Sequence, residues 1–315
     1  SIYGEHSDIY ACRQTGFAMI ASSSVQEVMD LGGIAHLSAI KGSVPFMHFF
    51  DGFRTSHELQ KIHVVDYEIL DQLVDHEAIH RFRKRSLNPE RPIMRSGAGS
   101  TETYFQQREA ANPYYDAIPD IVNDYMQRFG EKTGRHYQPF MYYGDPEAEY
   151  VIVAMGSVAG AARETVDYLN ARGKKTGFVQ VVLYRPFSAK YLLSVLPETV
   201  KKIAVLDRTK EPGAIGDPLY LDVCGALNEW DHSPAVVGGR YGLSIKDTTP
   251  AQIAAVFDNL EAEESRNHFT VGIVDDLTFT SLPVGPELHA AAPGTISCKF
   301  WGLGSDGTVG ANKNS

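Results

Sequence analysis

The second half of the chain alternates regularly between two hydrophobic periods. Apolar runs of strand length are separated by stretches with the 3.6-residue period of an amphipathic helix. Strands are predicted over residues 150–156, 178–184, 202–207, 235–238 and 269–274, and helices over 158–171, 189–196, 218–228 and 250–260. This alternation predicts a doubly wound parallel sheet with right-handed crossovers.

The first 135 residues show the same kind of unit less regularly. Residues 15–37 have helical spacing, and residues 44–50 form an apolar run that ends at the turn Asp51-Gly52. A charged amphipathic helix is predicted over 69–85 and a further helix over 119–129, with an extended crossing segment over 88–109. We therefore expect an α/β fold with two open, mainly parallel sheets.

Two segments interrupt the pattern and indicate boundaries. Residues 135–145 are rich in aromatic side chains and contain Pro139 and Gly144, which favours a domain boundary. Residues 282–293 carry three prolines and read as a linker. Beyond the linker, residues 295–301 are predicted as a strand that leads into a glycine-spaced loop.

Glycines at positions 302, 304, 307 and 310 favour a phosphate-binding loop, because backbone without Cβ atoms lets successive N–H groups converge on an anion. A helix opening at Gly310 and the charge of Lys313 would add to this. The spacing Gly302-x-Gly304-x-x-Gly307 also matches the dinucleotide-binding pattern of a nicotinamide-dependent dehydrogenase, although the expected ribose-binding acid would lie beyond Ser315. A tight turn between a strand and a helix is the alternative.

Composition excludes several classes. The formal net charge of −10 argues against a nucleic-acid partner, and no stretch reaches the roughly 20 apolar residues of a membrane span. Cys12, Cys224 and Cys298 lie far apart without a C-x-x-C motif, which argues against a disulfide framework and against a local zinc or iron–sulfur site. We expect no metal ligands among these residues.

Three loops carry candidate chemistry. Arg13 precedes the helix predicted near Thr15, where a guanidinium suits a small carboxylate; an ion pair with Glu5 or Asp8 is the alternative. The loop 51–58 offers a carboxylate, a guanidinium, hydroxyls and an imidazole after a strand, for ligand binding or for a subunit contact. Mixed charges in the loop 207–213 favour domain docking over catalysis.

Six stretches, spread in order over the whole chain, together resemble one family, the pyruvate:ferredoxin (flavodoxin) oxidoreductases. They are SIYGEH (1–6), YACRQTG (10–16), HFFDGFRTSHE (48–58), REAANPYY (108–115), LDRTKEPG (206–213) and CKFWGLGSDGTVGANKNS (298–315). The resemblance implies that residues 1–138 are the later part of a thiamine pyrimidine-binding domain. Residues 139–294 would be a second domain similar to the C-terminal domain of transketolase, and 295–315 the start of a coenzyme A-associated domain.

The same resemblance implies an activity and its cofactors. Family members are large chains, usually homodimers, that oxidatively decarboxylate pyruvate to acetyl-CoA and CO2. They use thiamine diphosphate, magnesium, coenzyme A and 4Fe-4S clusters, and pass electrons to ferredoxin or flavodoxin. A cytoplasmic location follows, or a hydrogenosome in a eukaryote. The chain would be an internal piece that is inactive alone, with the magnesium, the clusters and most thiamine contacts supplied from elsewhere. A non-catalytic coenzyme-binding or assembly module is the alternative.

The resemblance also assigns residues. It implies that Arg13 holds the pyruvate carboxylate, which favours a substrate role over the ion pair. It further implies that the glycine loop contacts a phosphate of coenzyme A, through Gly302, Gly304, Ser305, Asp306, Gly307, Thr308, Gly310, Asn312 and Lys313.

Overall fold

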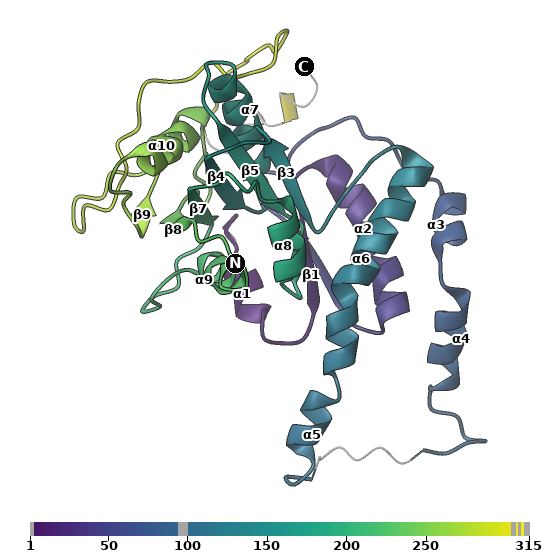
Figure 1. The fold of residues 1–315 in the computed structure, drawn as a ribbon. Coiled ribbons are helices and arrows are strands. Elements are labelled where there is room, and N and C mark those ends of the chain that lie inside the picture. The colour runs from purple at the N-terminus through teal and green to yellow at the C-terminus, as the bar shows by residue number, and fades with distance from the viewer. Residues whose placement is uncertain (1–2, 94–99, 304–306, 308–309, 312–315) are drawn as a thin grey trace.

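The computed structural model describes residues 3–93, 100–303, 307, 310 and 311, which form two sheets flanked by helices (Figure 1). The larger sheet has the strand order β3-β5-β4-β7-β8-β9, and the smaller one has the order β2-β1-β6. The predicted class, α/β with two open and mainly parallel sheets, is confirmed.

The larger sheet is the doubly wound unit predicted for the second half. Its strands are β3 (Phe140–Gly144), β4 (Tyr150–Ala154), β5 (Thr176–Val181), β7 (Lys202–Asp207), β8 (Ala235–Arg240) and β9 (Phe269–Thr270). All neighbours pair in parallel except β3, which runs antiparallel to β5 at one edge. Strand β3 lies inside the predicted boundary segment 135–145, and β9 is shorter than the predicted strand 269–274.

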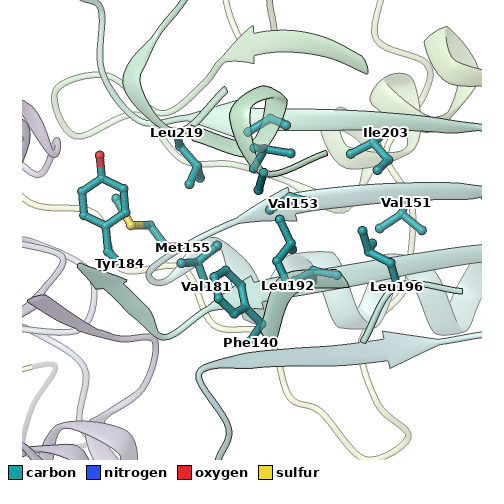
Figure 2. Close-up of a cluster of buried hydrophobic side chains, with 14 of the residues drawn as sticks. Phe140, Val151, Val153, Met155, Val181, Tyr184, Leu192, Leu196, Ile203 and Leu219 are labelled. Carbon is teal, nitrogen blue, oxygen red and sulfur yellow. The ribbon is translucent and has the colours of Figure 1, made fainter. Parts of the chain in front are cut away.

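Helices cover both faces of the larger sheet. One face packs against α7 (Val158–Asn170) and α10 (Pro250–Glu261), and the other against α8 (Ala189–Val195) and α9 (Pro218–Leu227). Alternate residues of each strand enter the two cores: Val151 and Val153 point to the α8–α9 side with Leu192 and Leu219, as Figure 2 shows. Ile152 enters the opposite core.

The smaller sheet is built around β1 (Ala18–Ser22), a strand buried on both faces. It pairs in parallel with β2 (Phe46–Phe50) and antiparallel with β6 (Leu183–Arg185), which arrives from the later part of the chain. The predicted helix over 15–37 is therefore wrong in its first part. Strand β1 occupies residues 18–22, and helix α2 (Val25–Gly42) begins only after its N-cap Ser24.

Both faces of β1 lie in hydrophobic cores. Ala18 and Ile20 pack with α2 and with the long helix α6 (Asn112–Thr133). Met19 and Ala21 join the core on the α8–α9 side of the larger sheet. The two sheets therefore share apolar packing and form one continuous body around β1.

The segment between β2 and α6 extends away from this body. The predicted helix 69–85 is two helices, α3 (Tyr67–Leu73) and α4 (His76–Lys84), because the side chain of Asp75 caps a new helix at the backbone N–H of Ala78. Contrary to the sequence prediction, the segment 88–109 is not extended throughout, because it ends in helix α5 (Tyr104–Glu109). Together with the lower part of α6, these elements form an arm that projects from the sheets (Figure 1).

The predicted strand 295–301 is not observed. These residues are exposed and have no partner strand, so the glycine loop does not follow a strand of either sheet. An isolated strand has no stable partner for its backbone groups, which explains why the apolar run does not form one here. Within the described residues, no helix combines the length and the apolar character needed to cross a bilayer.

Candidate functional site

A buried carboxylate at the end of β2 connects the two sheets. The side chain of Asp51 is 0% exposed, and it accepts hydrogen bonds from the backbone N–H and the hydroxyl of Ser157, the residue directly before α7. Its other partners are the Arg208 guanidinium at 2.9 Å and His6 Nε2 at 2.5 Å. Burial favours the neutral acid, but the charge and hydrogen bond of His6 and the charge of Arg208 outweigh it, and they hold the pKa of Asp51 below its usual range.

At two glycines, the backbone passes very close to Asp51 or to the residue after it. A Cβ on Gly156 would lie 2.7 Å from Asp51 Oδ1, and Gly156 has φ +82°. A Cβ on Gly4 would lie 2.3 Å from the carbonyl oxygen of Gly52. Glycine is therefore required at both points, where the start of the chain and the turn before α7 meet the loop after β2.

A second buried carboxylate lies at the end of β7. Asp207 accepts hydrogen bonds from the backbone N–H groups of Leu219 and Tyr220 at the start of α9, and from the hydroxyl of Tyr10 at 2.9 Å. Burial raises its pKa to about 7, against the opposing effect of these three donors. Tyr10 belongs to helix α1 (Ser7–Cys12), so this carboxylate also connects the two parts of the chain.

Arg13 lies directly after α1, at its C-cap. The sequence interpretation placed it beside the start of a helix near Thr15; this is wrong, because residues 13–17 form a turn that leads into β1. The alternative prediction, an ion pair between Arg13 and Glu5 or Asp8, is also wrong. Arg13 Nη1 donates to the carbonyl of Tyr10 at 2.7 Å, and Nη2 donates to Glu211 at 3.2 Å.

The loop 207–213 makes the docking contacts predicted for it. Glu211 binds Arg13, and the carbonyl of Arg208 accepts the backbone N–H of His6 at 2.9 Å. The loop after β2 contributes as well, since Arg54 pairs with Asp247 and donates to the carbonyl of Ile245. Charged loops from both parts of the chain therefore meet at the carboxyl ends of β2, β4 and β7.

A polar cavity of about 540 Å³ opens at this junction. Its walls include Arg54, Thr55, Ser157, Arg163 and Arg208. Such clefts between α/β units, at the carboxyl ends of their strands, are where ligands commonly bind. The loop 51–58, predicted to bind a ligand or to form a subunit contact, lines this cavity and contacts loops that follow strands of the larger sheet.

Most residues of the predicted phosphate loop lie outside the described residues. These are Gly304, Ser305, Asp306, Thr308, Asn312 and Lys313. Gly302 is exposed, Gly307 has φ +84°, and Gly310 is in helical conformation. Over the residues that the structure describes, no group of three or more His, Cys, Asp or Glu side chains could hold a metal ion.

Two family models match the chain over most of its length. Residues 1–127 match the thiamine diphosphate-binding model of pyruvate flavodoxin/ferredoxin oxidoreductases. Residues 148–253 match the model of pyruvate:ferredoxin oxidoreductase core domain II. The chain belongs to the pyruvate:ferredoxin (flavodoxin) oxidoreductase family. The family resemblance stated from the sequence is thereby confirmed.

Full-length relatives are much longer than this chain. It is 58% identical to the pyruvate:ferredoxin oxidoreductase of Moorella thermoacetica and 56% identical to the pyruvate-flavodoxin oxidoreductase of Enterobacter agglomerans. In both comparisons all of this chain aligns, and it spans 27% of the relative. A solved 2-oxoglutarate:ferredoxin oxidoreductase from Magnetococcus marinus aligns over 82% of this chain and 45% of its own, at 14% identity and a TM-score of 0.49.

Sequence reasoning proposed Arg13 and the loop 51–58 as candidates but did not predict the contacts that hold them. Tyr10 and Asp207 are 197 positions apart, and Asp51 and Arg208 are 157 apart. The available signal was that Asp51 and Asp207 each end a predicted apolar strand, where parallel strands bring loops together.

Proposed function

We propose that this chain is part of an enzyme that oxidatively decarboxylates pyruvate to acetyl-CoA and CO2, and passes the electrons to ferredoxin or flavodoxin. Membership of the family supports this proposal, as do the names of relatives that align with the whole chain. Residues 1–138 and 139–294 are proposed as two domains of that enzyme. The family-model matches fall within these limits.

Within that enzyme we assign the pyruvate carboxylate to Arg13. The observation that carries this assignment is the environment of Arg13: its side chain is 24% exposed, and its only anionic partner within the described residues is Glu211, whose side chain is 39% exposed. A guanidinium held at one edge by a backbone carbonyl keeps further N–H donors for a carboxylate. Fixing a short oxoacid by its carboxylate orients its keto carbon for reaction.

The described residues do not fit the diphosphate end of thiamine diphosphate, because they include no carboxylate cluster for the accompanying magnesium. No reaction step of this chain is therefore assigned to that group. Coenzyme A contact by the loop 302–313, the 4Fe-4S clusters, a homodimeric state and a cytoplasmic or hydrogenosomal location remain part of the proposal and follow from the family resemblance alone.

Kinetics of Arg13 variants in the full-length enzyme test the assignment. We expect Arg13→Ala to lower kcat/KM for pyruvate by roughly 30- to 700-fold, the loss of a charged contact of about 2–4 kcal/mol, while the KM for coenzyme A stays unchanged. Arg13→Lys should recover only part of this loss, because lysine cannot offer two parallel donors.

Glu211→Gln is the matched control, since it removes the ion pair and keeps Arg13. If Arg13 serves only to pair with Glu211, the two variants will show the same kinetic change. If Arg13 binds pyruvate, Glu211→Gln will leave the pyruvate KM unchanged or lower it.

A further inference from the structure

Helix α1, which presents Arg13, cannot fix its own position. It has six residues and no side-chain hydrogen bond at its N-cap, His6. Helices this short are unstable in isolation, because the first turns cost more conformational entropy than they return. The place of Arg13 in the enzyme therefore depends on the tertiary contacts that hold α1.

Those contacts come from buried carboxylates of the two sheets. His6 is held by Asp51 through its ring and by the carbonyl of Arg208 through its backbone. One helical turn further, the hydroxyl of Tyr10 donates to Asp207 Oδ1. The carbonyl of the same Tyr10 then accepts Arg13 Nη1 at 2.7 Å.

Asp207 is itself rigidly placed. It is 0% exposed at the end of β7, one of the central strands of the larger sheet, and both of its oxygens accept backbone N–H groups at the start of α9. Tyr10 is 3% exposed, and its ring meets the ring of Tyr184 edge to face at 5.4 Å between centroids. A continuous set of contacts therefore runs from the sheet to the guanidinium.

We propose that Asp207 is a positioning residue for substrate binding, which acts through the hydroxyl and carbonyl of Tyr10 to fix the Arg13 guanidinium. This inference rests on the proposed role of Arg13. It gives the proposed second domain, which carries Asp207, a part in binding pyruvate, whose carboxylate is held by Arg13 of the proposed first domain. Neither Asp207 nor Tyr10 touches the substrate.

Tyr10→Phe tests the inference in the full-length enzyme, because it removes the hydroxyl and preserves the packing. We expect the pyruvate KM to rise by about 2- to 12-fold, the effect of one lost hydrogen bond, with the KM for coenzyme A unchanged. In an Arg13→Ala background, Tyr10→Phe should cause less than about a twofold further change, because the residue that it positions is gone.

Tyr184→Phe is the matched control. It removes a hydroxyl that donates to Asp222 at 3.0 Å and leaves in place the Tyr184 ring that packs on Tyr10. Equal pyruvate KM values in the two Tyr→Phe variants would overturn the inference, as would an unchanged KM in Tyr10→Phe beside a raised KM in Arg13→Ala.

A chemical measurement separates this inference from the proposed function. Phenylglyoxal modifies accessible arginines, and mass spectrometry can quantify its reaction at Arg13. Faster modification of Arg13 in Tyr10→Phe than in Tyr184→Phe would support the positioning role, and equal rates would overturn it. An Arg13→Ala enzyme with unchanged pyruvate kinetics would overturn the proposed role of Arg13, whatever the labelling shows.

Discussion

Replacing Asp51 by Asn tests the buried charge network most directly. The substitution keeps the shape of the side chain but removes its charge from a site that is 0% exposed. It leaves the Arg208 guanidinium, 3% exposed, with a carbonyl partner at Gly242 and no carboxylate. Breaking a buried pair by removal of one partner costs about 3–5 kcal/mol, because the remaining charge stays out of water without compensation.

Two further contacts of Asp51 set the size within that range. The amide oxygen of an Asn could still accept the backbone N–H of Ser157, now 2.8 Å from the carboxylate. In that orientation the amide NH2 group would replace Oδ1 and face His6, and Arg208, which shares Oδ2 with Ser157, would meet a neutral oxygen in place of a carboxylate. We therefore expect a loss near the middle of the range, about 4 kcal/mol.

Urea denaturation of the 315-residue chain, followed by far-ultraviolet circular dichroism, measures this loss. Asp120→Asn is the control, because Asp120 is 63% exposed in its pair with Lys190 and such a surface pair contributes less than about 1 kcal/mol. If both variants lose the same free energy of unfolding, the reasoning that burial makes the Asp51 network stabilising is refuted.

Two further predictions concern the same chain. The pKa of Asp51 is lowered in the folded state, so its contribution to stability is present at neutral pH and is lost as the pH falls below about 4. In Asp51→Asn, the free energy of unfolding should therefore fall less steeply on the acid side. An unchanged slope would contradict this. Gly225→Ala in α9, where an added Cβ meets nothing within 4 Å, should raise the free energy of unfolding by about 0.5–1 kcal/mol. Gly4→Ala should lower it, because the added Cβ would collide with the carbonyl of Gly52. Urea titrations that show a change of the same sign in both variants would refute the close approach of Gly4 to Gly52.

Periodicity predicted most of the second half of the fold because clear turns separate its strands and helices. It failed at β1, where the five-residue run AMIAS is buried on both faces and lacks the alternation that marks a half-buried strand. A usable signal was nevertheless present. Ser24 followed by Glu27 is the pattern of a helix start, and the Ser24 side chain does accept the Glu27 backbone N–H.

The site was only partly predictable for a different reason. Arg13 and the loop 51–58 stand out by composition, but Glu211, Ser157 and Arg208 lie in loops more than a hundred residues later, and no local pattern encodes such a pairing. The error in the helix near Thr15 also reversed the electrostatic surroundings expected for Arg13. It lies at the C-terminal end of a helix, where a cation is favoured by the helix dipole, and not at the start of one.

The pairing of β6 with the smaller sheet affects how the protein can be divided into fragments. Leu183–Arg185 follows β5 of the larger sheet along the chain, yet pairs with β1 of the smaller one. A cut at residue 138 would therefore separate β1 from this neighbour and leave its backbone groups on that side exposed. Each half produced alone would have an open strand edge prone to self-association.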